Sequence, residues 1–214
     1  MKILTDKTLI ESHLRRNPAL HLYELGDLDD FFFPYTTWHA SEENGEIKSL
    51  ALLYQGTELP VLLALDDPGS VSMPGLLNEL KDKLPERFYC HLTSGYEKLL
   101  EDRFSLESHG THHKMTLTGK ATLDAVDCSG AVQLDAKDKG EILEFYASAY
   151  PDNWFDARML ETGKYFGLRR NGRLVSIAGI HVYSPQYKVA ALGNIATSQE
   201  FRGQGLGTKV TAAL

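Results

Sequence analysis

Apolar residues recur along parts of the chain at the spacing of a helix face, and elsewhere they gather into short runs typical of strands. The helical spacing predicts helices over 73–84 and 135–150. Ser94 and Glu97 have the spacing of a capping box, which predicts another helix that ends near Arg103. Short apolar or aromatic runs next to turn residues predict these segments as strands: 35–39, 47–54, 60–65, 87–92, 113–117, 165–169, 173–183 and 187–196. Short helices therefore alternate with short strands, as in an α/β (α+β) protein.

Two Asn-Gly pairs mark similar hairpins in the two halves of the chain. Asn44-Gly45 precedes one predicted strand and Asn171-Gly172 precedes another, and the offset is 127 residues (171 minus 44). Each hairpin is followed by a turn, an apolar strand and a helix. We interpret this order as two tandem halves, 1–118 and 119–214. The alternative is that any two hairpins with Asn-Gly turns look alike.

Composition narrows the classes of partner. The net charge of −7 and the pI of about 5.6 argue against binding to nucleic acid or to an anionic membrane, since both need a basic face. The apolar runs are far shorter than the roughly 20 residues of a membrane span. The N-terminus does not have the pattern of a signal peptide.

Cys90 and Cys128 form no metal or redox motif, which favours reduced thiols in the cytoplasm. His109, His112 and His113 lack companion ligands, so no metal is expected.

The segment with the clearest chemistry lies at 193–208. An apolar strand leads into Arg202-Gly203-Gln204-Gly205-Leu206-Gly207, and a predicted helix follows. Glycines let backbone N–H groups approach a phosphate closely, and the positive end of a helix adds to the attraction. A Walker loop would end in Gly-Lys-Ser/Thr, whereas Gly207-Thr208-Lys209 has another order. A Rossmann loop would have another glycine spacing and an acidic residue about 20 positions later.

This six-residue segment resembles the pyrophosphate loop of the GNAT superfamily of N-acetyltransferases, Q/R-x-x-G-x-G/A, at every defined position. Gln199 departs from the family, which usually has proline there. The order of elements resembles the family over about 114–214. The whole chain resembles bacterial members with two tandem GNAT-like halves and a degenerate first half. Asp66-Asp67 in that half would repel a pyrophosphate.

The resemblance implies a mixed, mostly antiparallel sheet flanked by helices, and acetyl-CoA as co-substrate without a metal. It implies direct attack of a primary amine, from a small molecule or a peptide, on the thioester. The N–H of Ile195 would polarise the thioester carbonyl. The implied CoA-binding residues are Ile195, Ala196, Thr197, Arg202, Gly203, Gln204, Gly205, Leu206, Gly207 and Thr208. A homodimer is a further expectation.

The sequence does not single out one residue as the general base or the general acid. Many family members carry a glutamate on the strand before the loop, but this strand offers only Asn194 and Thr197. His181 and Tyr183 on the neighbouring strand could relay a proton through water. The alternative for His181 is a packed or exposed strand residue.

The acceptor site implied by the resemblance involves the first two helices of the second half and their connection. Trp154, Phe155, Asp152 and Glu161 would there suit a small cationic amine. The alternative is that the aromatic residues only pack the helices together.

Two further expectations concern the chain as a whole. A GNAT fold normally continues after the helix that starts at Leu206, so the second half is expected to be incomplete at Leu214. A hypothesis from another functional class is a non-catalytic acyl-CoA-binding or regulatory module. The degenerate first half and the missing strand glutamate motivate it.

Overall fold

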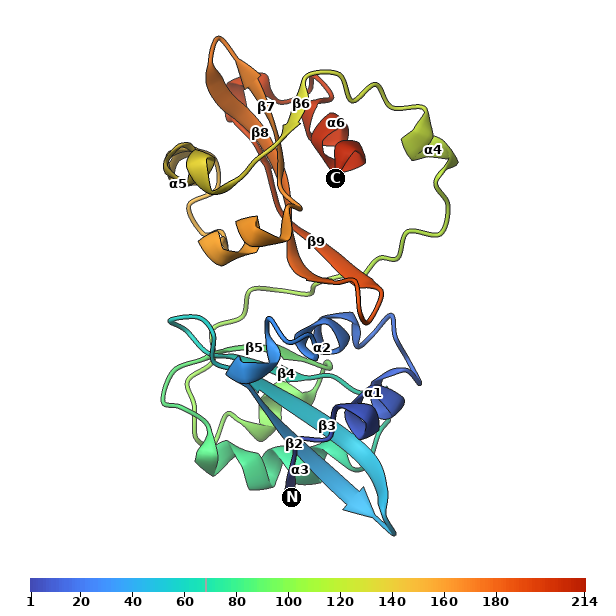
Figure 1. Cartoon of the computed structure of the whole chain (residues 1–214). Helices are drawn as coiled ribbons and strands as arrows, with labels where there is room; N and C mark the ends of the chain where they lie inside the picture. The colour runs from blue at the N-terminus through green and yellow to red at the C-terminus, as the bar shows by residue number, and fades with distance from the viewer. Residues whose placement is uncertain (68) are drawn as a thin grey trace. The chain divides into compact units, whose positions relative to one another are not determined.

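The computed structural model describes residues 1–67 and 69–214, which form two compact units, Met1–Met115 and Thr116–Leu214 (Figure 1). Each unit has its own sheet and its own buried core. The sequence predicts domains over 1–118 and 119–214, and independent folding of the two stays a prediction.

The N-terminal unit is built on a five-stranded sheet in the order β1-β2-β3-β4-β5. All neighbours in the sheet are antiparallel except β4 and β5, which are parallel. Three short 3-10 helices, η1 to η3, join the larger elements. The bounds are β1 (Lys2–Leu4), α1 (Lys7–Leu14), α2 (Leu22–Asp27), η1 (Phe33–Tyr35), β2 (Thr36–Glu43), β3 (Glu46–Tyr54), β4 (Val61–Ala64), α3 (Met73–Leu80), η2 (Lys81–Lys83), β5 (Tyr89–Leu92) and η3 (Tyr96–Leu99).

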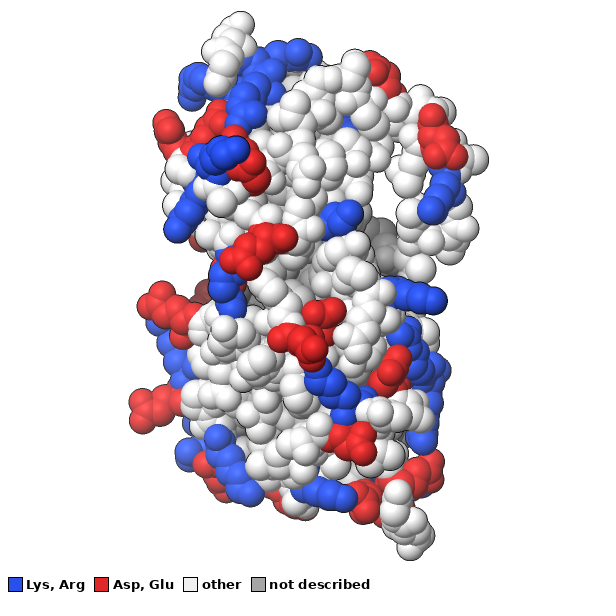
Figure 2. Space-filling view, in the orientation of Figure 1, with Lys and Arg blue, Asp and Glu red and all other residues white. Residues whose placement is uncertain are grey.

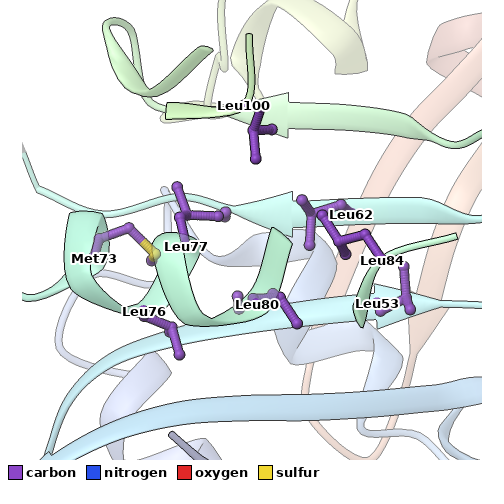
Figure 3. Packing of buried hydrophobic residues seen from close by; sticks show 10 residues of the cluster. Leu53, Leu62, Met73, Leu76, Leu77, Leu80, Leu84 and Leu100 are labelled. Atoms are coloured by element: carbon purple, nitrogen blue, oxygen red, sulfur yellow. The ribbon is translucent and has the colours of Figure 1, made fainter. Parts of the chain in front are cut away.

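Helix α3 supplies one side of the core of this unit (Figure 3). Its apolar residues recur at helical spacing and lie against the sheet, where they are almost fully buried. Truncating one such leucine to alanine is expected to cost about 2–5 kcal/mol of stability. The buried side chains labelled in Figure 3 are Leu53, Leu62, Met73, Leu76, Leu77, Leu80, Leu84 and Leu100.

The C-terminal unit has a four-stranded antiparallel sheet in the order β6-β7-β8-β9. Helices α5 and α6 lie on opposite faces of this sheet (Figure 1). The bounds are α4 (Ala121–Asp124), β6 (Ala131–Gln133), η4 (Ala136–Asp138), α5 (Lys139–Ala149), η5 (Ala157–Thr162), β7 (Phe166–Arg170), β8 (Arg173–Ser184), β9 (Val189–Thr197), η6 (Gln199–Phe201) and α6 (Leu206–Ala213). The fold class is therefore the expected one, a mixed α/β protein with mostly antiparallel sheets flanked by helices.

Both Asn-Gly pairs form the predicted tight turns. Asn44 and Gly45 have φ of 52° and 79°, and Asn171 and Gly172 have φ of 51° and 77°. Positive φ at both central residues is the geometry that joins antiparallel strands most closely. The two sheets also begin with the same succession of strand, helices and three antiparallel strands. Duplication of one ancestral unit stays a hypothesis.

Two sequence predictions are wrong. The helix expected to end near Arg103 is only the 3-10 turn η3, because Gly95 adopts φ of 97° and its N–H donates to the Glu97 carboxylate at 2.7 Å. No strand forms over 113–117; there the Lys114 ammonium lies 5.1 Å from the centroid of the Tyr23 ring instead. Strands β1 and β6 were not predicted, since three residues are too short to show a period.

The surface and the helices add two observations. Acidic and basic side chains are interspersed over the face shown in Figure 2, so the described residues on that face form no single field of one sign. Across residues 1–67 and 69–214, no helix is long and apolar enough to cross a membrane.

Candidate CoA-binding and acyl-transfer site

The glycine loop connects β9 to α6 in a conformation that only glycine adopts easily. Gly203 and Gly205 have φ of 76° and 74°, in the left-handed region that side chains with a Cβ disfavour. Gly205 is also the N-cap of α6. The N–H of Ser198 donates to the Val175 carbonyl at 2.9 Å, which fixes the start of the loop to β8.

The amide groups of this loop are available to a ligand. Among the described residues, no group accepts a hydrogen bond from the backbone N–H of residues 203–208, and the first helical bond runs from Lys209 N–H to Gly205 C=O. The helix itself is anchored, because Leu206 and Val210 are buried against Leu168 and Ala178. A rigid helix end with unpaired N–H groups is the arrangement that binds phosphate.

Two neighbouring hollows connect the loop with the strand. A cavity of about 540 Å³ lies between the end of α5 and β9, with Tyr150, Asn194 and Ile195 in its wall. A smaller hollow of about 270 Å³ lies over the loop residues Gly203 to Thr208. Thr197 and Arg202 line both, so the hollows adjoin. The Arg202 Nε donates to the Thr197 carbonyl at 3.0 Å, which holds the guanidinium at this junction.

Strand β9 carries a bulge beside the larger cavity. Ile177 pairs with Ala196 and Gly179 pairs with Gly193, so two residues of β9 face one residue of β8. Asn194 absorbs the extra residue with φ of 54°. Asparagine is one of the few side chains that tolerate this conformation.

A buried hydrogen-bond network holds the bulge. The Tyr146 hydroxyl donates to the Asn194 carbonyl at 2.6 Å, and the Asn194 Nδ2 donates to the Tyr165 hydroxyl at 3.1 Å. The Tyr165 hydroxyl in turn donates to the Ile180 carbonyl at 3.1 Å. The centroid of the Phe155 ring lies 5.4 Å from that of the Tyr146 ring and 5.5 Å from that of the Tyr165 ring. The network therefore joins α5, the segment before η5, and the strands β8 and β9.

Burial keeps these phenols protonated. It raises the pKa of Tyr146 far above the ordinary value and the pKa of Tyr165 to about 12. Both hydroxyls therefore remain hydrogen-bond donors over the whole physiological range of pH.

His181 lies on the same region of the sheet. Its ring occupies the space beside Gly193, where an added Cβ would come within 2.0 Å of the ring Cδ2. Burial lowers the pKa of the imidazole, so the neutral form dominates at pH 7. Tyr183 lies further along β8, opposite Ala190, with the Lys164 ammonium 5.0 Å from its ring centroid.

The structure gathers some of the predicted site residues and not others. Asn194 to Thr197 and Arg202 line the larger cavity, and the loop residues line the smaller one except Gln204. The four predicted acceptor residues Trp154, Phe155, Asp152 and Glu161 do not line either hollow. Phe155 instead packs between two tyrosine rings. The sequence does not predict that the site includes Ala149, Gly193 or the Tyr165 hydroxyl. Each lies there because of contacts with residues that are distant in the sequence.

No cluster of three or more histidine, cysteine or acidic side chains in the described ranges, 1–67 and 69–214, is arranged to hold a metal ion. Cys90 and Cys128 are free thiols.

Comparison with known families addresses the same region. Residues 130–214 match the model of the acetyltransferase (GNAT) family. This segment is a GNAT-family domain. It contains the bulge, the glycine loop and both hollows.

Solved structures similar to the chain are also GNAT proteins. A GNAT-family structure from Novosphingobium aromaticivorans is 26% identical over 42% of this chain and 39% of its own, with a TM-score of 0.36. A GNAT-family acetyltransferase from Colwellia psychrerythraea is 16% identical over 99% of this chain and 83% of its own, with a TM-score of 0.45. The chain thus spans well under half of the Novosphingobium protein. No curated protein matches significantly.

Proposed function

We propose that the GNAT domain transfers an acetyl group, or another acyl group, from acyl-CoA to a primary amine of a small molecule or peptide. The observation that carries this proposal is the loop at the start of α6. Its backbone N–H groups from 203 to 208 have no acceptor among the described residues, and the hollow over them adjoins the cavity beside Ile195. The family supports acyl transfer from acyl-CoA in general terms.

The loop is the proposed site of the CoA pyrophosphate. The N–H groups of Gly203, Gln204, Gly205, Leu206, Gly207 and Thr208 would donate to its oxygens. Gly203 and Gly205 have no protein atom within 4 Å of an added Cβ, so the space that a side chain would fill is open to a ligand. Arg202 at the junction of the hollows adds a positive charge.

Strand β9 is the proposed track for the pantetheine arm. From Thr197 to Ile195 it leads from the loop into the larger cavity, and Ala196 lies between them in the same wall. The Thr197 carbonyl already accepts from Arg202, so the arm would use other backbone groups of the strand. The thioester carbonyl would then lie near the N–H of Ile195.

The proposed reaction is a direct displacement. The nitrogen of a neutral amine attacks the thioester carbon, and a C–N bond forms while the carbonyl oxygen becomes negative. The Ile195 N–H stabilises this oxygen. The C–S bond then breaks, the amine nitrogen loses a proton to a base, and the CoA thiolate leaves and is protonated.

His181 is the proposed base, directly or through water. Its neutral form at pH 7 can accept a proton, and its ring lies against Gly193 in the cavity wall. Tyr183 on the same strand and Asn194 in the wall are proposed to order the water that carries the proton.

The acceptor is proposed to enter beside the end of α5. Tyr150 lines the cavity and directly precedes the segment with Asp152, Trp154 and Phe155. Trp154 is 40% exposed and Glu161 is exposed, so both could contact a bound amine at the rim. A cytoplasmic location and a homodimer complete the proposal, and the free thiols fit a reducing compartment.

Calorimetry with CoA, followed by thiol release from acetyl-CoA across a panel of primary amines, tests this function. The expected result is CoA binding and amine-dependent thiol release. Failure of CoA to bind would contradict the proposal outright. CoA binding without turnover on any amine would favour the second candidate, a non-catalytic acyl-CoA-binding module. The absence of carboxylates from both cavity walls, as far as the structure describes them, motivates that alternative.

A further inference from the structure

The peptide unit between Asn194 and Ile195 is held by one specific contact. The Tyr146 hydroxyl, from the last turn of α5, donates to the Asn194 carbonyl at 2.6 Å. Tyr146 is 1% exposed and Asn194 is 4% exposed. A short hydrogen bond shielded from water in this way is costly to lose, because the buried carbonyl would keep no equivalent partner.

Sheet pairing alone does not fix this peptide. At the bulge two residues of β9 face one residue of β8, so the regular ladder is interrupted between Gly193 and Ala196. The left-handed φ of 54° at Asn194 is also disfavoured for most residues. An additional restraint is therefore needed to keep a single orientation here.

Orientation of the carbonyl determines that of the next N–H. A peptide bond is planar and trans, so the C=O of Asn194 and the N–H of Ile195 point in opposite directions. Because Tyr146 holds the carbonyl towards α5, it also fixes the direction of the Ile195 N–H. Ile195 lines the larger cavity and is 40% exposed.

We propose that Tyr146 is a positioning residue for acyl transfer: its hydroxyl fixes the 194–195 peptide so that the Ile195 N–H meets the acyl carbonyl oxygen. This inference rests on the proposed function, since it assigns a role to a residue that touches neither substrate. It gives α5 a part in the chemistry beyond forming one wall of the cavity.

A second set of contacts supports the same peptide from its side chain. Asn194 Nδ2 donates to the Tyr165 hydroxyl at 3.1 Å, and Tyr165 is fully buried. Phe155 lies against both tyrosine rings and limits their movement. Burial also raises the pKa of Tyr146, so its hydroxyl remains protonated and able to donate over the whole physiological pH range.

The test compares Tyr146→Phe with Tyr165→Phe. Each change removes one buried hydroxyl, but only the first removes the bond to the 194 carbonyl. Losing an oxyanion donor costs about 100- to 1000-fold in kcat, so a donor that is misdirected for part of the time should cost about 10- to 100-fold. We expect this fall in kcat for Tyr146→Phe with CoA affinity nearly unchanged, and a smaller fall for Tyr165→Phe at a similar loss of stability.

A spectroscopic measurement separates positioning from general destabilisation. The infrared band of a ¹³C-labelled acetyl carbonyl should shift to lower frequency when acetyl-CoA binds the natural protein, and Tyr146→Phe should reverse most of that shift. An unchanged kcat, or an unchanged carbonyl band in Tyr146→Phe, would overturn the inference. Equal losses of kcat in the two variants would also overturn it, because a structural role would then suffice.

A measurement on the natural chain covers the case in which Tyr146→Phe does not fold. The Ile195 amide proton resonance should move downfield with acetyl-CoA and much less with CoA, which has no acyl carbonyl. An equal response to both ligands overturns the inference. If no amine is acetylated, the function proposed above fails, but the carbonyl band of Tyr146→Phe still decides the role of Tyr146, and the amide resonance still decides whether the Ile195 N–H meets the acyl carbonyl.

Discussion

The imidazole of His181 lies against the α-carbon of Gly193 on the neighbouring strand, where a Cβ would come within 2.0 Å of the ring. Gly193 has no left-handed φ, so the ring and not the backbone requires glycine at this position. The same relationship holds between Tyr165 and Gly179, where the distance is 2.2 Å. Glycines in these two strands thus make room for the rings that lie beside the cavity.

Substituting Gly193 by alanine should destabilise the protein through this contact. Overpacking of this kind costs about 1–3 kcal/mol, and the cost should nearly vanish when His181 is also alanine. Urea denaturation of the four proteins in a double-mutant cycle measures the coupling. The same penalty in both backgrounds would show that the ring does not restrict residue 193.

Stability of the C-terminal unit should depend on pH through His181, the single histidine among residues 116–214. Burial lowers its folded-state pKa, so at pH values below about 6.5 the unfolded chain binds a proton that the folded chain does not. Stability should therefore be full above that value and fall as the pH drops towards the folded pKa. Denaturation curves between pH 8 and pH 5 check this.

The control for this pH effect is His181→Gln, which removes the titrating group and keeps a polar side chain of similar length. Its stability should fall less over the same interval, since the remaining decline comes from other groups. His13 and His39, whose pKa values burial also lowers, contribute equally to both proteins. Parallel curves for the natural protein and the variant would contradict the prediction.

The sequence predicts the loop and its flanking elements well because their signals are local. Apolar runs bounded by turn residues indicate β8 and β9, and the glycines at 203 and 205 indicate the turn before α6. The signal for each of these segments lies within the segment itself. The fold class could be predicted for the same reason.

The rest of the site depends on contacts between distant residues. Tyr146 meets Asn194 across 48 positions, and no periodicity relates them. The sequence shows Tyr146 only as an inward residue of a helix, and its hydroxyl partner depends on how α5 crosses the sheet. The bulge has one weak signal, a Gly-Asn pair within an apolar strand, because asparagine tolerates positive φ. Ser94 and Glu97 give the converse case, because their local signal predicts a helix that does not form. Gly95 between them has a left-handed φ, and only the 3-10 turn η3 follows.

Glu141 should stabilise the placement of α5 on the sheet. Its carboxylate accepts from the Arg169 guanidinium at 2.5 Å and from the Leu174 N–H at 2.8 Å, and it is half-buried. Glu141→Ala should lower the free energy of unfolding by about 1–3 kcal/mol, because it leaves the Leu174 N–H and part of Arg169 without a partner. Glu144→Ala, an exposed position on the same helix, should change it by less than about 0.5 kcal/mol. Equal effects in urea denaturation would contradict a specific role for Glu141.

Gly205 offers the most direct test of the CoA loop, because its matched control lies elsewhere in the same unit. Gly205→Ala and Gly172→Ala both place a Cβ on a left-handed residue, with φ of 74° and 77° and open space around each. Both should therefore lose a similar amount of stability, about 1 kcal/mol. Only the change at 205 alters the surface on which the pyrophosphate is proposed to lie.

Calorimetric titration with CoA then separates the effect of backbone strain from a specific loss of CoA binding. Gly172→Ala should bind CoA as the natural protein does, and Gly205→Ala should bind more weakly. Gly205→Glu adds a carboxylate beside the phosphates, and like charges in contact cost several kcal/mol, so its affinity should fall by at least about 100-fold. Since residue 205 lies among the N–H groups of 203–208 that are assigned to the pyrophosphate, unchanged affinity in Gly205→Glu would place CoA elsewhere on the protein.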